Sequence, residues 1–274
     1  MRHAIVTGTF DDLRSRDVRF LEEASKFGPL HVLLDSDHVA RGIDSCVPKF
    51  SQAERQYFLE SIRYVSRITL INKSGDSEYL PEEHVAATSD WVVNERNASE
   101  AAKAFCYANG LGYQVISDQQ LRGFPTANRT IAKYADVAPK IVLVTGSYDW
   151  FHSGHIRFFE EVSALGLLYV VVGHDANILL LKGDGHPMFS EDERRYMAGS
   201  IRFVEHALIS TGNGWLDAEP EIEKIRPDIY AVNEDGDRPE KRDYCQAQGI
   251  EYRVLKRRPK PGLQVRQSTD LRGF

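Results

Sequence analysis

The chain has 274 residues and a formal net charge of −6, with 42% hydrophobic and 27% charged residues. At roughly 100–200 residues per domain, this length predicts about two domains of an ordinary soluble globular protein. The acidic balance argues against a general nucleic-acid-binding protein, and no stretch approaches the ~18 uninterrupted apolar residues of a membrane span.

The cysteines and the first residues narrow the class further. Cys46, Cys106 and Cys245 cannot all pair with one another and show no Cys-x-x-Cys spacing, so we expect neither a disulfide framework nor a zinc knuckle. The opening MRHAIVTGTF is typical of a first strand and lacks the apolar core and cleavage site of a signal peptide. We therefore expect a cytoplasmic protein.

Two similar blocks of sequence indicate an internal duplication. Residues 50–65 (FSQAERQYFLESIRYV) and 189–204 (FSEDERRYMAGSIRFV) are identical at nine of 16 positions, and Arg55 and Arg194 lie 139 residues apart. The same spacing relates three further pairs: Val93-Asn94-Glu95 to Val232-Asn233-Glu234, Cys106 to Cys245, and Gly110 to Gly249. Because self-similarity at a fixed spacing marks repeated architecture, we expect two copies of one domain.

A segment between the copies fits neither of them. Residues 125–140 hold both Pro125 and Pro139, and each copy closes on Leu-Arg-Gly-Phe, at 121–124 and 271–274. We therefore expect three parts along the chain: a first domain at 1–125, a linker at 126–138 and a second domain at 139–274.

The second copy alternates strand and helix signals. Strands are predicted from β-branched or all-apolar runs, at 141–146, 167–173, 229–233 and 250–256. Helices are predicted from apolar spacing and capping residues, at 155–165, from Ser190 to about Phe203, and from 239 to 248 before Gly249. This alternation favours an α/β class with two tandem Rossmann-like, doubly wound parallel-sheet domains related by internal duplication.

A histidine pair follows the first strand of the second copy. Thr145-Gly146-Ser147-Tyr148-Asp149 forms the turn after the strand, and His152-Ser153-Gly154-His155 leads into a helix. Such sheets bind ligands at the carboxyl ends of their strands, and a helix N-terminus offers free N–H groups and a partial positive charge. Each imidazole can donate a hydrogen bond to phosphate oxygens, so the pattern indicates phosphate chemistry at an exposed helix entrance.

The strand, turn, His-x-Gly-His and helix together resemble the HxGH nucleotidyltransferases, in particular their cytidylyltransferase branch. Further blocks resemble the family along nearly all of 140–274: VVVGHDANILLLKG, FSEDERRYMAGSIRFV, DIYAVNEDGD and KRRPKPGLQVRQSTDLR. The two-copy layout is similar to that of ethanolamine-phosphate cytidylyltransferases. One departure lies in the closing segment, where LQVRQ separates Gly262 from Ser268.

The resemblance implies a reaction and a set of site residues. A phosphorylated small alcohol or sugar would attack the α-phosphorus of CTP, and Mg²⁺ would be held through the triphosphate rather than by side chains. Catalytic roles are implied for His152, His155 and Lys182. Nucleotide-binding roles are implied for the turn, the loop after the 229–233 strand and the closing segment, namely Thr145, Gly146, Ser147, Tyr148, Gly154, Asn233, Glu234, Asp235, Arg257, Arg258, Ser268 and Thr269.

Simpler interpretations of single residues stay open at this point. Lys182 fits an ordinary solvated lysine, and the basic run at 256–260 fits a solvated charge cluster. Asp149 and Arg194 are further candidates for the site, but Arg55 matches Arg194 in the first copy, which also fits a structural role.

The first copy has lost every chemical element of this pattern. TGTFDDLRSRDVRFL aligns without a gap on TGSYDWFHSGHIRFF, so that Arg14, Arg16 and Asp17 replace His152, Gly154 and His155. At a spacing of 139 residues, Lys182 falls on Ile43, and the first copy lacks the KRRPKPG region. We expect a catalytically inactive domain that pairs with the second copy within the chain.

Two other functions stay open. One is an adenylyltransferase that uses ATP on a phosphorylated small molecule, and the other is a nucleotide-binding protein without catalysis. The expected partners are the nucleotide and the acceptor, with no nucleic acid and no membrane span, and a homo-oligomer is a further expectation.

Overall fold

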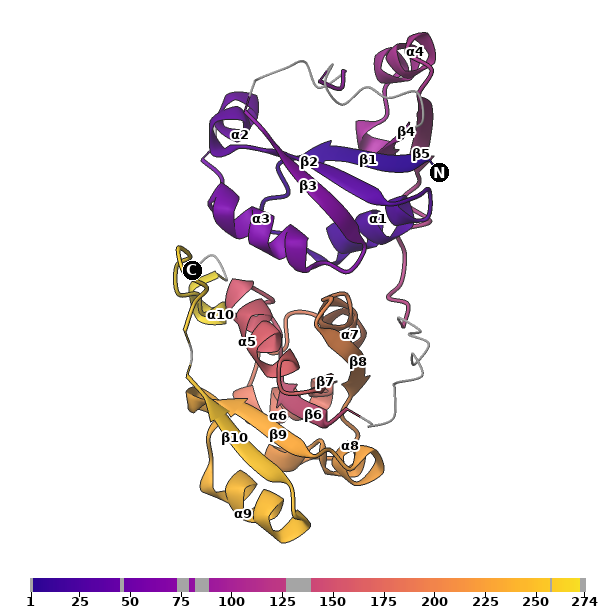
Figure 1. Cartoon of the computed structure of the whole chain (residues 1–274). Helices are drawn as coiled ribbons and strands as arrows, with labels where there is room; N and C mark the ends of the chain where they lie inside the picture. Colours follow the sequence, from indigo (N-terminus) through magenta and orange to yellow (C-terminus); the bar gives the residue numbers. More distant parts are fainter. Residues whose placement is uncertain are drawn as a thin grey trace. The chain divides into compact units, whose positions relative to one another are not determined.

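The structure is a computed structural model that describes residues 2–44, 47–72, 79–81, 89–126, 139–256 and 258–271. The chain divides into two compact units, Met1–Gly123 and Phe124–Phe274 (Figure 1). Most of the expected linker, residues 127–138, lies outside the described residues. Each unit is described separately.

The first unit is a five-stranded parallel sheet with helices between its strands. Its strands are β1 His3–Gly8, β2 Leu30–Asp35, β3 Val65–Ile71, β4 Ser89–Asn94 and β5 Gly112–Ile116. Its helices are α1 Ser15–Ser25, α2 Asp37–Asp44, α3 Gln52–Ser61 and α4 Glu100–Ala108, with a 3₁₀ turn at Glu95–Asn97. The strand order is β3-β2-β1-β4-β5.

The second unit repeats this order. Its strands are β6 Ile141–Gly146, β7 Leu167–Val172, β8 Val204–Ile209, β9 Ile229–Asn233 and β10 Glu251–Leu255. Its helices are α5 Ser153–Ser163, α6 Asp175–Lys182, α7 Glu191–Gly199, α8 Glu219–Ile225, α9 Pro239–Gln248 and α10 Ser268–Leu271, with 3₁₀ turns at Gly214–Leu216 (η3) and Glu234–Gly236 (η4). The order β8-β7-β6-β9-β10 matches that of the first unit strand for strand.

These sheets confirm the predicted fold class of two parallel-sheet α/β units. Every strand pairing in both sheets is parallel, and the central strands are buried on both faces, which explains their all-apolar sequences. In the second unit α5 and α7 lie on one side of the sheet and α8 and α9 on the other (Figure 1). The strand order reverses between β6 and β9, and ligands of such sheets bind at the carboxyl ends beside this reversal.

The predicted helix boundaries differ from the observed ones by a few residues. The N-cap of α7 is Ser190, whose hydroxyl accepts a bond from the Glu193 N–H at 3.4 Å, as the capping pattern predicts. The helix ends at Gly199, earlier than the predicted Phe203, because the chain turns into β8. Helix α9 ends as predicted, with Gly249 in the left-handed region at φ 69°.

The core of the second unit between the sheet and α8 and α9 is apolar. It consists of Leu143, Val171, Ala218, Ile222, Tyr230, Val232 and Cys245. On the opposite face, the start of the unit is anchored to α7: Arg195 donates to the Phe124 carbonyl at 2.7 Å and to the Thr126 hydroxyl at 3.1 Å. Residues just after Gly123 therefore pack as part of the second unit.

The predicted correspondence of Ile43 in the first copy with Lys182 in the second was wrong. The sequence spacing placed Ile43 opposite Lys182, but the two helices α2 and α6 correspond at a spacing of 138 residues, which places Asp44 opposite that lysine. The matching ion pairs Arg55–Asp37 and Arg194–Asp175 give the same correspondence at the start of these helices. The extra residue of the second copy lies after α6, in the loop before Phe189, where the absence of secondary structure leaves no pattern to locate it.

Candidate active site

The histidine pair lies at the start of α5. His152 is the N-cap residue, and its Nδ1 accepts a hydrogen bond from the Gly154 N–H at 3.0 Å. Its side chain is only 2% exposed, so the sequence-based picture of an exposed helix entrance was wrong for this residue. The ring of His155 stacks on it, with centroids 4.0 Å apart. The two imidazoles thus form one rigid pair at the positive end of the helix.

Gly154 allows the histidine ring to approach the backbone closely. A Cβ at this position would lie 2.8 Å from Cε1 of His152, which is closer than side chains tolerate. It would also lie 3.5 Å from the backbone carbonyl of Arg266, in the closing segment of the chain. Glycine is therefore required where the cap, the helix start and the closing segment meet.

The turn after β6 passes beside this pair. The Thr145 hydroxyl and the Tyr230 hydroxyl of β9 are 2.6 Å apart, which links the two strands at the point where the strand order reverses. Tyr148 has a positive φ of 48°, and its ring contacts His155 edge to face, with centroids 5.4 Å apart. A Cβ at Gly146 would lie 2.9 Å from Cζ of Tyr148, so this glycine makes room for the ring.

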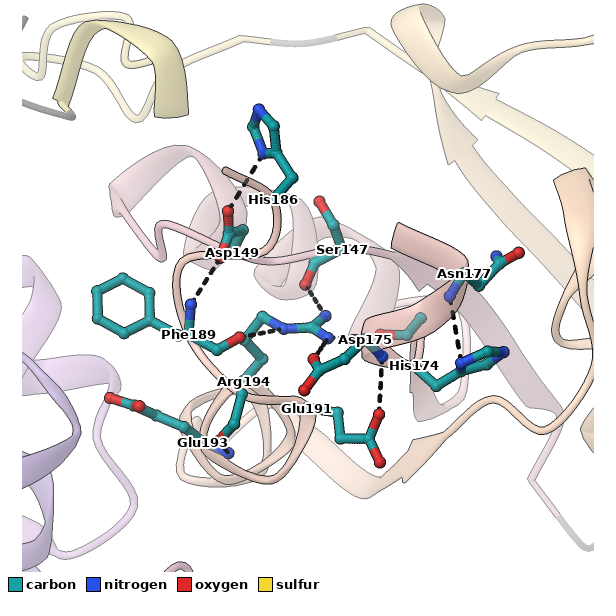
Figure 2. A network of polar contacts seen from close by, with 12 residues as sticks. Ser147, Asp149, His174, Asp175, Asn177, His186, Phe189, Glu191, Glu193 and Arg194 are labelled. Carbon is teal, nitrogen blue, oxygen red and sulfur yellow. Dashed lines mark hydrogen bonds and ion pairs between the residues drawn. The ribbon is translucent and has the colours of Figure 1, made fainter. Parts of the chain in front are cut away.

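Asp149 and Arg194 hold the loops around the site (Figure 2). The buried carboxylate of Asp149 accepts hydrogen bonds from the N–H groups of Met188 at 2.8 Å and Phe189 at 3.1 Å. The guanidinium of Arg194, 1% exposed, donates to the carbonyls of Phe189, Ser147 and Gly173 and to the carboxylate of Asp175, at 2.6–2.9 Å. The guanidinium thus donates its hydrogen bonds to the loops and the helix that surround the site.

The first unit contains the same two sets of hydrogen bonds, made by Asp11 and Arg55. Asp11 accepts from the N–H groups of Lys49 at 2.7 Å and Phe50 at 2.9 Å. Arg55 donates to the carbonyls of Phe50, Thr9 and Asp35 and to the carboxylate of Asp37, at 2.6–3.2 Å. Because the first unit keeps both sets of contacts without the His-x-Gly-His pair, these contacts support a structural role for Asp149 and Arg194.

Lys182 is the last residue of α6, and its side chain reaches back to the turn. Its ammonium donates to the Ser147 hydroxyl at 2.8 Å. The turn after β6 therefore contacts Lys182 through Ser147 and the histidine pair through Tyr148.

A pocket lies between the start of α5, the end of β9 and the closing segment. Its lining includes Ser153, Gly154, Phe158, Glu161, Asn233, Lys256, Arg258, Pro259, Lys260, Leu263, Gln264, Val265 and Arg266. Four of these side chains are cationic, although Lys260 also pairs with Glu160 at 3.3 Å. A basic pocket beside a helix N-terminus suits an anion with several charges.

The remaining predicted residues do not all lie beside the histidine pair. Ser268 starts α10, and its hydroxyl donates to the Trp150 carbonyl at 3.3 Å, close to the histidine pair. Glu234 and Asp235 are exposed in η4, directly after β9. Arg257 and the side chain of Thr269 lie outside the described residues.

Sequence reasoning missed a polar group on the other side of β9. Lys241, in the first turn of α9, has its ammonium 5.8 Å above the Tyr230 ring and 3.5 Å from the Gly236 carbonyl. Burial lowers the pKa of Lys241, and the neighbouring Arg238 lowers it further. Tyr230 gave no signal in the sequence because its strand, IYAVN, fits an ordinary core strand.

The corresponding place in the first unit is occupied by ion pairs. Arg14, which replaces His152, pairs with Asp12, and its N–H donates to Asp17 at 2.9 Å. Arg16, which replaces Gly154, pairs with Asp118 from the closing segment of that unit. Arg14 and Arg16 thus already have carboxylate partners.

Two features of the described residues bear on other classes of function. No group of three or more His, Cys, Asp or Glu side chains that could hold a metal ion occurs within them. None of the helices in this part of the chain is long and apolar enough to cross a membrane.

Comparisons with known proteins agree with the geometry of the second unit. The family model described as cytidylyltransferase-like matches residues 143–252. A FAD synthase of Ferroglobus placidus is 31% identical over 48% of this chain and 85% of its own length, and one of Aciduliprofundum boonei is 34% identical over 42% and 76%. The bifunctional protein HldE of Aliarcobacter butzleri is 29% identical over 34% of this chain and 20% of its own length.

The matched residues run from β6 into β10 and include the histidine pair and Lys182. They exclude the first unit. Because the chain covers more than three quarters of both FAD synthases at over 30% identity, it belongs to the cytidylyltransferase-like family of the nucleotidyltransferases.

Proposed function

We propose that the second unit transfers a nucleoside monophosphate from a nucleoside triphosphate to the phosphate of a small molecule. The observation that carries this proposal is the stacked pair His152 and His155 beside a pocket with four cationic side chains. Such a pocket neutralises a triphosphate, and the imidazoles donate hydrogen bonds where charge builds up in the transition state.

The reaction is a single displacement at phosphorus. An oxygen of the acceptor phosphate forms a bond to the α-phosphorus, and the bond from the α-phosphorus to the bridging oxygen of the β-phosphate breaks. Pyrophosphate leaves with the bonding electrons, so no covalent enzyme intermediate is needed. Catalysis consists of holding the two reactants in line and stabilising the phosphate charge.

The hydrogen bond of His152 determines which ring nitrogen of the neutral imidazole carries the proton. Because Nδ1 accepts from the Gly154 N–H, the neutral ring carries its proton on Nε2. That N–H is the group available to a phosphate oxygen. The cap therefore orients the ring and selects the tautomer that can donate.

Lys182 supplies positive charge at the other side of the turn. Its contact with the Ser147 hydroxyl holds the ammonium near the end of β6. A phosphorylated acceptor that approaches the α-phosphorus there brings two anionic groups together, and a lysine between them reduces their repulsion. Arg258 and Arg266 would bind the β- and γ-phosphates from the pocket side.

A divalent cation fits this site only through the nucleotide. The described residues offer no cluster of three metal-binding side chains, and the carboxylate of Asp149 is engaged by two backbone N–H groups. Mg²⁺ would therefore be held by triphosphate oxygens, where it would neutralise charge on the leaving pyrophosphate.

The donor is ATP or CTP. The relatives named FAD synthase favour ATP, because FAD contains an adenylyl group. CTP, which the sequence motifs favour, is the second candidate. The pocket wall formed by Asn233 and Gln264 could accept or donate hydrogen bonds to either base.

The first unit is proposed to be an inactive copy that arose by duplication. Identical strand orders and the paired devices of Asp11 with Asp149 and Arg55 with Arg194 support common descent. The ion pairs of Arg14 and Arg16 support the loss of phosphate binding there.

Pyrophosphate release tests the activity. The full chain is incubated with Mg²⁺, each of the four nucleoside triphosphates and a panel of phosphate monoesters, including FMN, glycerol 3-phosphate and sugar phosphates. We expect release with ATP or CTP and one class of acceptor. No release with any pair, together with measurable triphosphate binding, would support a nucleotide-binding protein without catalysis.

A further inference from the structure

Tyr148 carries a buried hydroxyl that has no hydrogen-bond partner within the described part of the chain. The side chain is 5% exposed, and among the described residues its oxygen contacts no donor or acceptor. Buried hydroxyls are normally hydrogen-bonded, since one left unpaired destabilises the folded state. The hydroxyl therefore needs an explanation other than stability.

The first unit shows that this turn forms without the hydroxyl. Phe10 occupies the corresponding position, with φ 49° compared with 48° at Tyr148. Its ring also lies over a glycine, since a Cβ at Gly8 would be 3.5 Å from Cε2 of Phe10. The ring is thus required by the turn in both units, whereas the oxygen occurs only in the unit with the histidine pair.

The oxygen lies where the strand order reverses. Cζ of Tyr148, which bears it, would lie 2.9 Å from a Cβ at Gly146, the last residue of β6. The same ring touches His155 edge to face. The hydroxyl therefore lies near the carboxyl end of β6, on a ring that touches one member of the histidine pair.

Its neighbours favour a neutral oxygen as the ligand. Burial raises the pKa of Tyr148, and Tyr230 and Asp235 raise it further, so the hydroxyl stays protonated and can donate. The negative charge of Asp235, which acts on this hydroxyl, disfavours a phosphate beside it, whereas a carboxylate can accept a hydrogen bond. An alcoholic hydroxyl satisfies both groups, because it accepts from a tyrosine and donates to a carboxylate.

We propose that Tyr148 binds an alcoholic hydroxyl of a substrate, which comes either from the ribose of the nucleotide or from the carbon skeleton of the acceptor. This inference rests on the proposed function. It adds a specificity-determining residue: substrates that lack the hydroxyl leave the buried oxygen unpaired and bind less well.

The test is the Tyr148→Phe variant of the full chain with matched substrate pairs. On the donor side, kcat/KM is compared between ATP and its 2′-deoxy and 3′-deoxy forms, and likewise for CTP. On the acceptor side, glycerol 3-phosphate is compared with propyl phosphate, which lacks the free hydroxyls. We expect the wild type to favour one hydroxyl-bearing member by about tenfold, and the variant to lose that preference.

The pair that loses its preference identifies the source of the hydroxyl. Tyr244→Phe is the matched control, because the Tyr244 hydroxyl on α9 also lacks a partner among the described residues, and it should leave all ratios unchanged. The melting temperature of Tyr148→Phe should equal or exceed that of the wild type.

Two results would overturn the inference, and they can be told apart. If the wild type releases pyrophosphate but Tyr148→Phe weakens both members of every pair equally, the hydroxyl binds no substrate and the proposed function stands. If the wild type releases no pyrophosphate with any pair, the proposed function itself fails.

Discussion

The imidazole of His152 has a structural role and, in the proposed function, also a chemical one. Its Nδ1 caps α5, and its Nε2–H would donate a hydrogen bond to a phosphate oxygen. His155 lies within α5 rather than at its N-cap, and its ring is held between those of His152 and Tyr148. The two residues should therefore respond differently to substitution.

His152→Ala and His155→Ala should each lower kcat by roughly 10²–10³, the effect of removing one transition-state donor. His152→Ala should also lower the free energy of unfolding by about 1 kcal/mol, because the cap is lost. His152→Asn keeps a capping side chain and should recover the stability but not the turnover. Steady-state kinetics and urea unfolding measure both, and near wild-type turnover in His152→Asn would contradict the assignment.

Arg194→Ala should unfold the second unit more easily by at least about 2 kcal/mol, since three carbonyls and one carboxylate lose their donor. Arg55→Ala should have a similar effect in the first unit. Arg253→Ala, on the exposed part of β10, should stay within about 0.5 kcal/mol. A stable Arg194→Ala protein with lost nucleotide affinity would instead assign this arginine to the site.

At the scale of an element, α9 begins with an unfavourable charge arrangement. Arg238 is its N-cap, and Lys241 lies in the first turn, where the helix dipole disfavours cations. No carboxylate lies within 4.0 Å of the Lys241 ammonium among the described residues, and burial is the main cause of its lowered pKa. A lysine whose pKa is lowered in the folded state destabilises that state while it is charged.

Lys241→Gln should therefore raise the free energy of unfolding at pH 7 by about 0.3–1 kcal/mol. The gain is present while the wild-type lysine is charged and shrinks as the pH rises through the lowered pKa towards the ordinary value of 10.5. Lys224→Gln is the control, because Lys224 lies in the last turn of α8 and its loss should destabilise slightly. Urea unfolding from pH 7 to pH 10 measures both, and equal effects of the two variants would contradict the argument.

At the scale of the whole chain, the exact boundary between the units matters when one unit is produced as a separate fragment. Arg195 bonds to Phe124 and Thr126, and the Phe124 ring packs on Tyr196 with centroids 5.8 Å apart. A second unit that starts at residue 139 lacks these contacts. The first unit ends at Gly123.

A fragment 124–274 should therefore melt at a higher temperature than a fragment 139–274. If the first unit is needed as a partner, both fragments should lose turnover relative to the full chain while fragment 124–274 still binds ATP or CTP. Calorimetry and pyrophosphate release measure these effects. A fully active fragment 124–274 would show that the first unit is dispensable for catalysis.

The fragment 1–123 should not bind ATP or CTP, because its arginines at the site already pair with Asp12 and Asp118. Arg14→His combined with Asp17→His should not create activity in it, since Asp44 stands opposite Lys182 and the first copy lacks the KRRPKPG segment. Isothermal titration measures the affinity. Binding comparable to that of the second unit would instead favour an effector site in the first unit.

Much of the fold could be predicted from local sequence. The apolar runs of β6 and β7, the Ser190 cap and Gly249 are signals within a few residues, and each marks an element that the structure confirms. Helix ends and the residue opposite Lys182 were harder, because the loop between α6 and α7 has no periodicity that would locate an insertion.

The sequence by itself determined the two-unit organisation, the parallel α/β class and the His-x-Gly-His motif, because repeats, periodicity and such a motif are each visible along the chain. Only the tertiary structure decided which polar residues are bonded to the framework. Asp149, Arg194 and Tyr148 are all polar residues near one turn, yet two are engaged by distant backbone groups and the third keeps a buried hydroxyl without a partner among the described residues. Burial and hydrogen bonding depend on long-range packing, which a local pattern does not contain.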